Sequence, residues 1–143
     1  MSKKKLTAAE QSLSQVTLFK RLEPRQIKEL AQVADITSAK QGKTLITEGA
    51  LGRELIVIME GTVDVIRSGQ TIASLGPGDA VGEMALIDHQ EASATVVTTS
   101  PCELVVVEGR RFKPLLDDIP GLAAALLASV CARLREADKA FDV

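Results

Sequence analysis

The sequence GEMALIDHQEASATV, from Gly82 to Val96, follows the turn signal GPGD at 76–79 and ends in a Thr/Val run that is typical of a strand. Its glycine, its acid Glu83 and the helix formers after them predict one helical turn between two strands. The first turn of a helix has unpaired backbone N–H groups and a partial positive charge, so a phosphate would bind there, and a glycine lets the backbone approach closely. Glu83 would repel that phosphate if it pointed at it, but it can accept hydrogen bonds from sugar hydroxyls. The pattern therefore indicates a phosphorylated sugar as ligand.

The composition is that of a soluble globular domain, with 143 residues, 45% apolar and 25% charged. This length predicts one domain with its own hydrophobic core. A formal net charge of -2, and three Phe without Tyr or Trp, argue against nucleic acid as a partner. No apolar run is long enough to span a bilayer, and the basic residues 3–5 are not followed by a signal-peptide core. We therefore expect a cytoplasmic protein with neither a nucleic-acid nor a membrane partner.

The residues that usually carry catalysis or bind metals are sparse. Cys102 and Cys131 lie in different predicted elements without metal-ligand spacing, which predicts two reduced, mostly buried thiols. His89 is the one histidine, and we expect an exposed loop residue without a role, although a protonated imidazole there could donate to an anion. The sequence shows no nucleophile–base set and no ligand cluster for zinc or iron–sulfur. The chain is predicted not to be an enzyme and to hold no covalent cofactor and no metal.

Helical patterns stand before and after a central region with the period of strands. Thr7 and Glu10 form a capping-box pattern for a short helix over 7–15, and Pro24 opens a second helix. The apolar face predicted for that second helix consists of Ile27, Leu30, Ala31 and Ala34. Helical patterns return over 110–118, where Pro114 interrupts them, and from 120 to about 140.

Short β-rich runs alternate with turn signals between the two helical regions, which is typical of a small barrel or jelly roll. A two-residue hairpin turn is predicted at Ser68-Gly69. The predicted strands cover 36–39, 44–47, 54–59, 62–67, 70–75, 94–99 and 102–107.

The last helix has apolar residues at alternating steps of four and three, which is a heptad seam. Two interpretations stay open at this point: a seam for a homodimer or a partner protein, or one amphipathic helix that packs on its own domain. The seam consists of Ala123, Leu127, Val130, Leu134, Ala137 and Phe141.

The order of these elements, with VGEMAL at 81–86 and ASATV at 92–96, resembles the cyclic-nucleotide-binding domain of catabolite activator proteins and protein kinase A regulatory subunits. The resemblance extends from about Val16 to Leu134. It implies a mainly β fold: an eight-stranded β-roll (a jelly-roll-like double-stranded β-helix) with N-terminal helices and a C-terminal helix pair. The implied organisation is a tail and short helix over 1–15 and one domain over 16–143. The roll would cover about 35–107, and the C-terminal helices about 110–140.

The resemblance also implies a role for each matching position. Gly82 and Ala85 would offer backbone contacts to the ligand, and Glu83 would accept a hydrogen bond from the ribose 2′-hydroxyl. Ser93 matches a position beside the phosphate. The positions that match the apolar lining of sugar and base are Val65, Ile72 and Ala73. In members whose C-terminal helix acts as a lid, the region around Ser129 and Val130 would cover the base.

One position departs from the family pattern, which has a phosphate-binding arginine where this chain has Ala92. No Lys or Arg occurs between Ser68 and Gly109, whereas several acids do. A charge-assisted hydrogen bond contributes about 1.5–3 kcal/mol, which is roughly 10- to 150-fold in affinity, so its loss predicts weak binding. Arg53 and Arg67 could reach the pocket from other turns, but the default expectation for both is a solvated surface charge.

Two functions from different classes follow. The first is a non-enzymatic sensor or regulatory module that binds cAMP or cGMP and signals through its C-terminal helix. The alternative is a degenerate pocket whose domain serves dimerisation or protein interaction, or binds a different ligand. A transcription factor of the catabolite-activator type would need a helix-turn-helix segment after the roll, which residues 1–143 do not contain.

Overall fold

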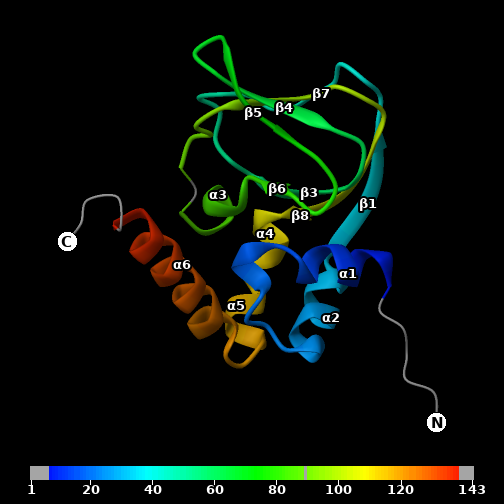
Figure 1. Ribbon diagram of the computed structural model, residues 1–143. Helices are drawn as coiled ribbons and strands as arrows, with labels where there is room; N and C mark the ends of the chain where they lie inside the picture. The colour runs from blue at the N-terminus through cyan, green and yellow to red at the C-terminus, as the bar shows by residue number, and fades with distance from the viewer. Residues whose placement is uncertain (1–6, 89, 139–143) are drawn as a thin grey trace.

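The computed structural model describes residues 7–88 and 90–138. A β-roll forms one half of the molecule, and the helices from both ends of the chain pack together beneath it (Figure 1). The predicted class, an eight-stranded roll with flanking helices, is confirmed. The expected tail at the start of the 1–15 segment lies outside the described residues.

The eight strands form two antiparallel sheets of four, in the orders β1-β8-β3-β6 and β2-β7-β4-β5. The predicted two-residue hairpin turn is confirmed between β4 and β5, where Arg67 pairs with Gln70 and Ser68 and Gly69 both have positive φ. The strands are β1 (Ala34–Ala39), β2 (Thr44–Ile46), β3 (Glu54–Glu60), β4 (Val63–Arg67), β5 (Gln70–Leu75), β6 (Ala80–Val81), β7 (Thr95–Thr98) and β8 (Cys102–Glu108).

The helices begin and end near the predicted residues. Thr7 and Glu10 form the expected reciprocal capping box at the start of α1, and Pro24 is the first residue of α2. The break expected at Pro114 separates α4 from α5. The helices are α1 (Ala8–Ser14), the 3-10 turn η1 (Thr17–Phe19), α2 (Pro24–Gln32), α3 (Glu83–Asp88), α4 (Gly109–Phe112), α5 (Leu115–Asp118) and α6 (Leu122–Asp138).

The run LIVIM at 55–59 in β3 is apolar throughout because both faces of this strand are buried. Leu55 and Val57 point into the core shared with the helices, whereas Ile56 and Ile58 point into the interior of the roll. Alternate side chains of a strand lie on opposite faces, so a strand with a core on each side has no polar face. β3 therefore joins the two halves of the molecule.

Three details differ from the sequence-based expectations. α2 ends at Gln32, so Ala34 begins β1 instead of extending the helical face. Residues 80–81 form a short strand, β6, that was not predicted, since two residues are too few to show a period. Cys102 is buried as expected, but Cys131 is exposed, because it lies on the outer side of α6.

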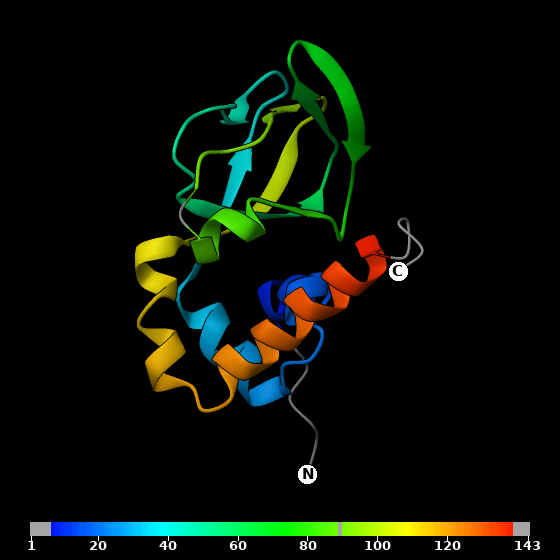
Figure 2. The ribbon, with the colours of Figure 1, turned by 90° about the vertical axis from the view of Figure 1, so that its left-hand side faces the viewer.

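α6 packs on the rest of the domain through one face only. Leu122, Leu126 and the hydroxyl-bearing Ser129 are buried, and the helix lies against η1 and passes beneath α3 and the roll (Figure 2). Among residues 7–88 and 90–138 no single helix is long and apolar enough to cross a membrane. Gly109–Asp118 and Leu122–Ala132 reach that length and composition only together, and they are bent by 113°.

Candidate ligand-binding cavity

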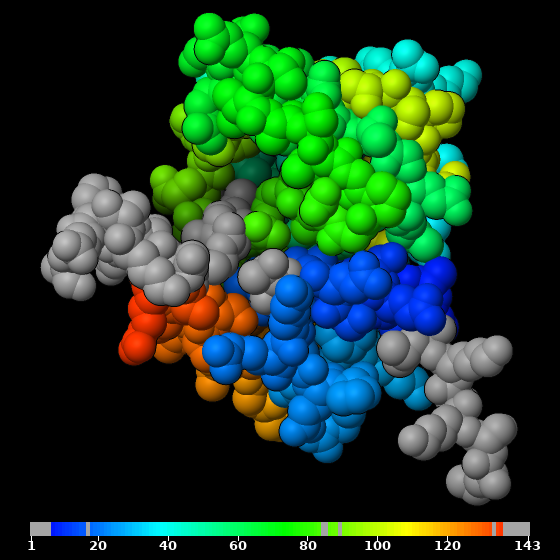
Figure 3. All heavy atoms as spheres, in the orientation of Figure 1, coloured from blue at the N-terminus to red at the C-terminus, as the bar shows by residue number. Residues whose placement is uncertain are grey.

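A cavity of about 630 Å³ opens at one end of the roll, beside α3. Figure 3 shows a hollow in this surface below the β4–β5 hairpin. Such a volume is within the range of small-molecule sites. Its walls come from β2, the loop before β3, β4, the turn into α3 and the segment that leads to β7. The lining residues are Leu45, Ile46, Thr47, Ala50, Leu51, Gly52, Arg53, Glu54, Val65, Val81, Gly82, Glu83, Asp88, Gln90, Glu91, Ala92, Ser93, Ala94 and Val96.

The predicted helical turn after Gly82 is present as α3, which begins at Glu83. Gly82 has a φ of 82°, a conformation that L side chains rarely adopt, and its carbonyl oxygen accepts from the Leu86 N–H at 3.2 Å. Both Gly82 and Glu83 line the cavity. Ala85 lies within α3, but the structure does not describe its side chain.

The segment that carries Ala92 is held by a short ladder to the loop before β3. The Ala92 N–H donates to the Ala50 carbonyl at 2.7 Å, and the Gly49 N–H donates to the Ala92 carbonyl at 2.9 Å. A third bond joins the Gly52 N–H to the Gln90 carbonyl at 3.1 Å. The loop at 47–53 therefore forms one wall of the cavity, although the sequence-based site did not include it.

Ser93 lies at the rim of the cavity and is contacted by Arg67 from the end of β4. The Arg67 Nε donates to the Ser93 carbonyl at 3.0 Å, and one terminal nitrogen lies 3.5 Å from the Ser93 hydroxyl. Arg67 is exposed, but it is not merely a solvated charge as expected. Arg53 is also exposed and lines the cavity directly.

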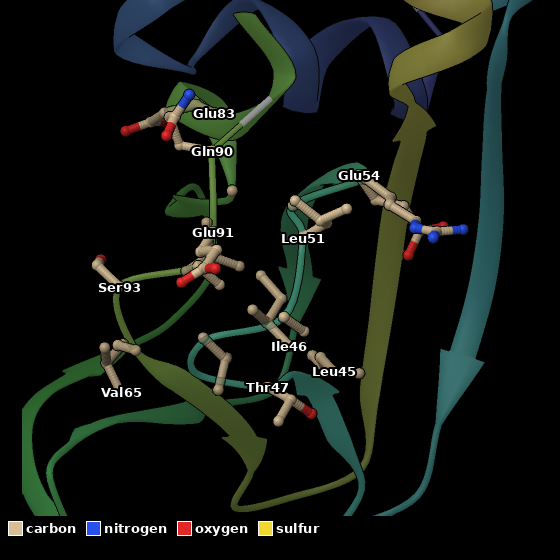
Figure 4. Close-up of a pocket in the computed structure, with 18 of the residues that line it drawn as sticks. Leu45, Ile46, Thr47, Leu51, Glu54, Val65, Glu83, Gln90, Glu91 and Ser93 are labelled. Carbon is tan, nitrogen blue, oxygen red and sulfur yellow. The ribbon is translucent and has the colours of Figure 1, made fainter. Parts of the chain in front are cut away.

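Apolar side chains form the remaining walls. Figure 4 shows Val65 and Ser93 on one side, Leu51 and Ile46 on the other, and Glu83 and Gln90 toward one end. Of the apolar positions expected to line the ligand, Val65 lines the cavity.

Ile72 and Ala73 are not among the lining residues and are exposed on β5. The ladder between β4 and β5 is irregular at this point: Val65 pairs with Ala73 but Ile66 with Thr71, so Ile72 is the extra residue of a bulge.

Negative charge predominates in the lining. The charged residues that line the cavity are Arg53 and the four acids Glu54, Glu83, Asp88 and Glu91. The position expected to carry an arginine, Ala92, offers only a methyl group. A phosphate in this cavity therefore needs a cation that reaches it from outside the 68–109 segment.

α6 contributes no residue to the cavity lining in the described part of the chain. Ser129 is 4% exposed and its hydroxyl has no hydrogen-bond partner among the described residues, while Val130 packs against the core shared with the other helices. In this structure Ser129 and Val130 thus pack on the domain and do not cover the cavity.

The remaining sequence-based candidates give no further site. His89 lies outside the described residues. No group of three or more His, Cys, Asp or Glu residues within 7–88 and 90–138 is arranged to hold a metal ion.

Comparison with known proteins gives the same family that the sequence resembles. A profile of the cyclic nucleotide-binding domain matches residues 36–118. The cyclic AMP receptor protein of Thermus thermophilus is 38% identical over 108 residues, which are 72% of this chain and 50% of that protein. The cAMP-dependent protein kinase regulatory subunit of Yarrowia lipolytica is 30% identical over 118 residues, which are 82% of this chain and 32% of that one.

A solved structure shares the fold closely. The N-terminal domain of a transcriptional regulator from Streptomyces coelicolor A3(2) superposes with a TM-score of 0.82 at 31% identity, covering 90% of this chain and 96% of that one. The chain spans half or less of the two curated relatives, so it corresponds to one part of each. With its roll, its cavity and the matched profile, the chain belongs to the cyclic nucleotide-binding domain family.

Proposed function

We propose that this chain is a non-enzymatic regulatory module that binds cAMP or cGMP in the cavity at the end of its roll. The observation that carries the proposal is the cavity itself, which brings together Gly82, Glu83, Val65 and Ser93 from three separate segments. Two curated relatives are named for cyclic AMP, one as its receptor and one as a subunit of the kinase that depends on it.

The proposed pose follows from the chemistry of the walls. The ribose lies near Glu83, whose carboxylate accepts from the 2′-hydroxyl, and the cyclic phosphate lies near Ser93 at the rim. Base and sugar carbons contact Val65 and the apolar residues of the opposite wall. The 2′-hydroxyl and the phosphate of the ligand then each meet a polar side chain, which is what a buried polar group requires.

We propose that ligand binding is signalled through α6. Its buried face rests on η1 and the helical core, close to α3, so a change at the α3 end of the cavity has a short route to the helix. The unpartnered Ser129 hydroxyl is consistent with a second position for α6, since a buried hydroxyl without a partner is costly. Hydrogen exchange of α6 with and without cAMP tests this, and unchanged exchange rates contradict it.

Thermal unfolding of the chain with cAMP, cGMP, 5′-AMP and no ligand tests the binding. Ligand at a hundredfold over its Kd adds about 2.7 kcal/mol. For a chain of this size we expect Tm to rise by roughly 5–15 °C with a cyclic nucleotide. No shift at millimolar cAMP and cGMP would contradict the proposal.

The second candidate function is a domain for dimerisation or protein interaction that has lost the nucleotide, or binds another ligand. The excess of acids in the cavity lining favours it, because those acids oppose a phosphate. It predicts no Tm shift with cyclic nucleotides in the native protein. The same thermal experiment therefore separates the two candidates.

A further inference from the structure

The alternation of β4 places Arg67 beside the cavity: Arg67 is not itself a lining residue, but it contacts the lining residue Ser93. Val63 is fully buried inside the roll, and Val65, two residues on, lines the cavity. The pairing of β4 with β7 is regular from Val63 to Ile66, so the alternation is unbroken on this strand. Successive side chains of a strand point to opposite faces, and Arg67 is therefore the next side chain on the interior face, at the mouth of the roll.

The contacts of Arg67 hold its guanidinium beside Ser93, where the proposed pose has the phosphate. Its Nε donates to the Ser93 carbonyl at 3.0 Å, and one terminal nitrogen lies 3.5 Å from the Ser93 hydroxyl. A guanidinium has five N–H donors in a planar fork, so these two contacts orient it without exhausting it. Among residues 7–88 and 90–138, no ion pair involves Arg67. The Glu48 carboxylate lies close by, where it accepts from the Ser68 N–H at 3.0 Å, but it forms no ion pair with Arg67 in the described structure.

The rest of the cavity does not supply this charge at Ser93. Ala92 is neutral, and the sequence has no Lys or Arg from 68 to 109. Arg53 also lines the cavity, at the start of β3, but no hydrogen bond joins its side chain to Ser93 in the described structure. Within 7–88 and 90–138, Arg67 is the cation whose side chain contacts Ser93.

We propose that Arg67 is the phosphate-binding cation of this pocket, in place of the arginine expected at position 92. The inference rests on the proposed function and deepens it: the ligand is an anionic nucleotide whose phosphate lies between Ser93 and the end of β4. The counter-charge then comes from a strand end beside the hairpin, and not from the segment between α3 and β7.

The test is isothermal titration calorimetry of the full chain with cAMP and, as a probe without phosphate, adenosine. Arg67→Ala is expected to weaken the affinity for cAMP by roughly 10- to 150-fold, the range for a charge-assisted hydrogen bond. The affinity for adenosine should stay within about twofold of the native value. Arg67→Lys keeps the charge but not the planar set of N–H donors, and we expect an intermediate loss of affinity for cAMP. Arg53→Ala removes an equal charge from the lining of the cavity and is the matched control, with a smaller loss of cAMP affinity.

Unfolding of each variant in denaturant shows whether it folds as the native chain does, and an exposed arginine is expected to change stability little. Full cAMP affinity in Arg67→Ala overturns the inference but leaves the proposed function intact. An equal loss for cAMP and adenosine also overturns it, because the role of Arg67 is then structural. Absence of cAMP binding by the native chain is the separate outcome in which the proposed function fails, and the inference fails with it.

A rescue adds an independent readout. In the Arg67→Ala chain, adding Ala92→Arg places a guanidinium at the position where the family pattern has one, and cAMP affinity should return to the native value or above. Ala92→Gln in the same background adds a side chain of intermediate length without charge and should not restore it. Equal recovery by both substitutions would overturn the role of charge.

Discussion

The backbone carbonyl oxygen of Glu54 occupies the space that a side chain at Gly82 would need. A Cβ at this position would collide with that oxygen, and Gly82 also has a φ of 82°. Glycine is therefore required here for two reasons, the close approach of two backbones and the left-handed conformation. Since Glu54 and Gly82 both line the cavity, this contact sets the shape of one of its walls.

Gly82→Ala should consequently destabilise the fold more than conformational strain alone does. The left-handed conformation costs about 1–2 kcal/mol for a residue with a Cβ, and the collision with a backbone atom raises the total to on the order of 3 kcal/mol or more. Denaturant unfolding measures the loss. Gly69→Ala is the control, because Gly69 has a similar φ of 79° but open space around it. This variant should lose only the stability that the backbone strain costs. Equal losses at both positions would show that the Glu54 contact is unimportant.

Ala92→Arg should raise the affinity for cAMP in the native background. The backbone at position 92 is fixed on both sides by the bonds to Gly49 and Ala50, so the substitution changes the side chain and not the path of the chain. We expect a gain at the lower end of roughly 10- to 150-fold, since Arg67 already places a positive charge near Ser93. Calorimetry measures it, with Ala92→Gln as the uncharged control. Unchanged or weaker binding of cAMP would contradict the proposed position of the phosphate.

Glu83→Gln should remove the discrimination between cAMP and its 2′-deoxy analogue. The native chain is expected to bind cAMP more tightly, because a carboxylate that accepts from the 2′-hydroxyl contributes about 1.5–3 kcal/mol. In Glu83→Gln the two ligands should differ much less, and Asp88→Asn, which neutralises another lining acid, should keep the difference. Competition between the two nucleotides for each variant is the measurement. A native chain that binds both equally would contradict the role given to Glu83.

The fold was predictable from the sequence because its local signals agree with one another. The capping box at Thr7, the proline at position 24 and the hairpin turn at Ser68 all lie where their patterns indicated. The uniformly apolar run of β3 shows no period, but its two buried faces follow from packing between two cores. Agreement between local preference and global fold of this kind is typical of natural sequences.

The site was predictable only in part, because half of it depends on pairing between distant segments. Gly82, Glu83 and Ser93 belong to one recognisable motif, and each lines the cavity. The wall formed by residues 47–53 depends on its backbone hydrogen bonds with the segment of Gln90 and Ala92. No local sequence pattern predicts this pairing. For Arg67 a signal did exist, since it continues the Val63 and Val65 alternation on β4. The exclusion of Ile72 from the lining could not have been foreseen, because it depends on a bulge in β5.

The heptad seam on α6 is solvent-exposed in the single chain, and this gives a test of the proposed dimer. Leu127 and Leu134 are 64% and 59% exposed, whereas Leu122, Leu126 and Ser129 of the same helix are buried against the domain. Of the other seam positions, Ala123 is exposed and Val130 half-buried; the side chain of Ala137 is not described, and Phe141 lies outside the described residues. The seam and the packing face are thus neighbouring sides of one helix that share Val130, so both interpretations of its pattern can hold together.

Leu127→Glu should therefore shift the chain from dimer to monomer without unfolding it. An exposed surface change alters the stability of a monomer by about 0.5 kcal/mol at most, but a charge buried in a seam disfavours association. Sedimentation velocity over a range of concentrations measures the shift, and Tm should lose its dependence on concentration. Ala132→Glu is the matched control: it is exposed on the same helix and lies about 140° around the axis from Leu127 at 100° per residue. A native chain that is monomeric at all concentrations, or a control that dissociates the dimer equally, would contradict the seam.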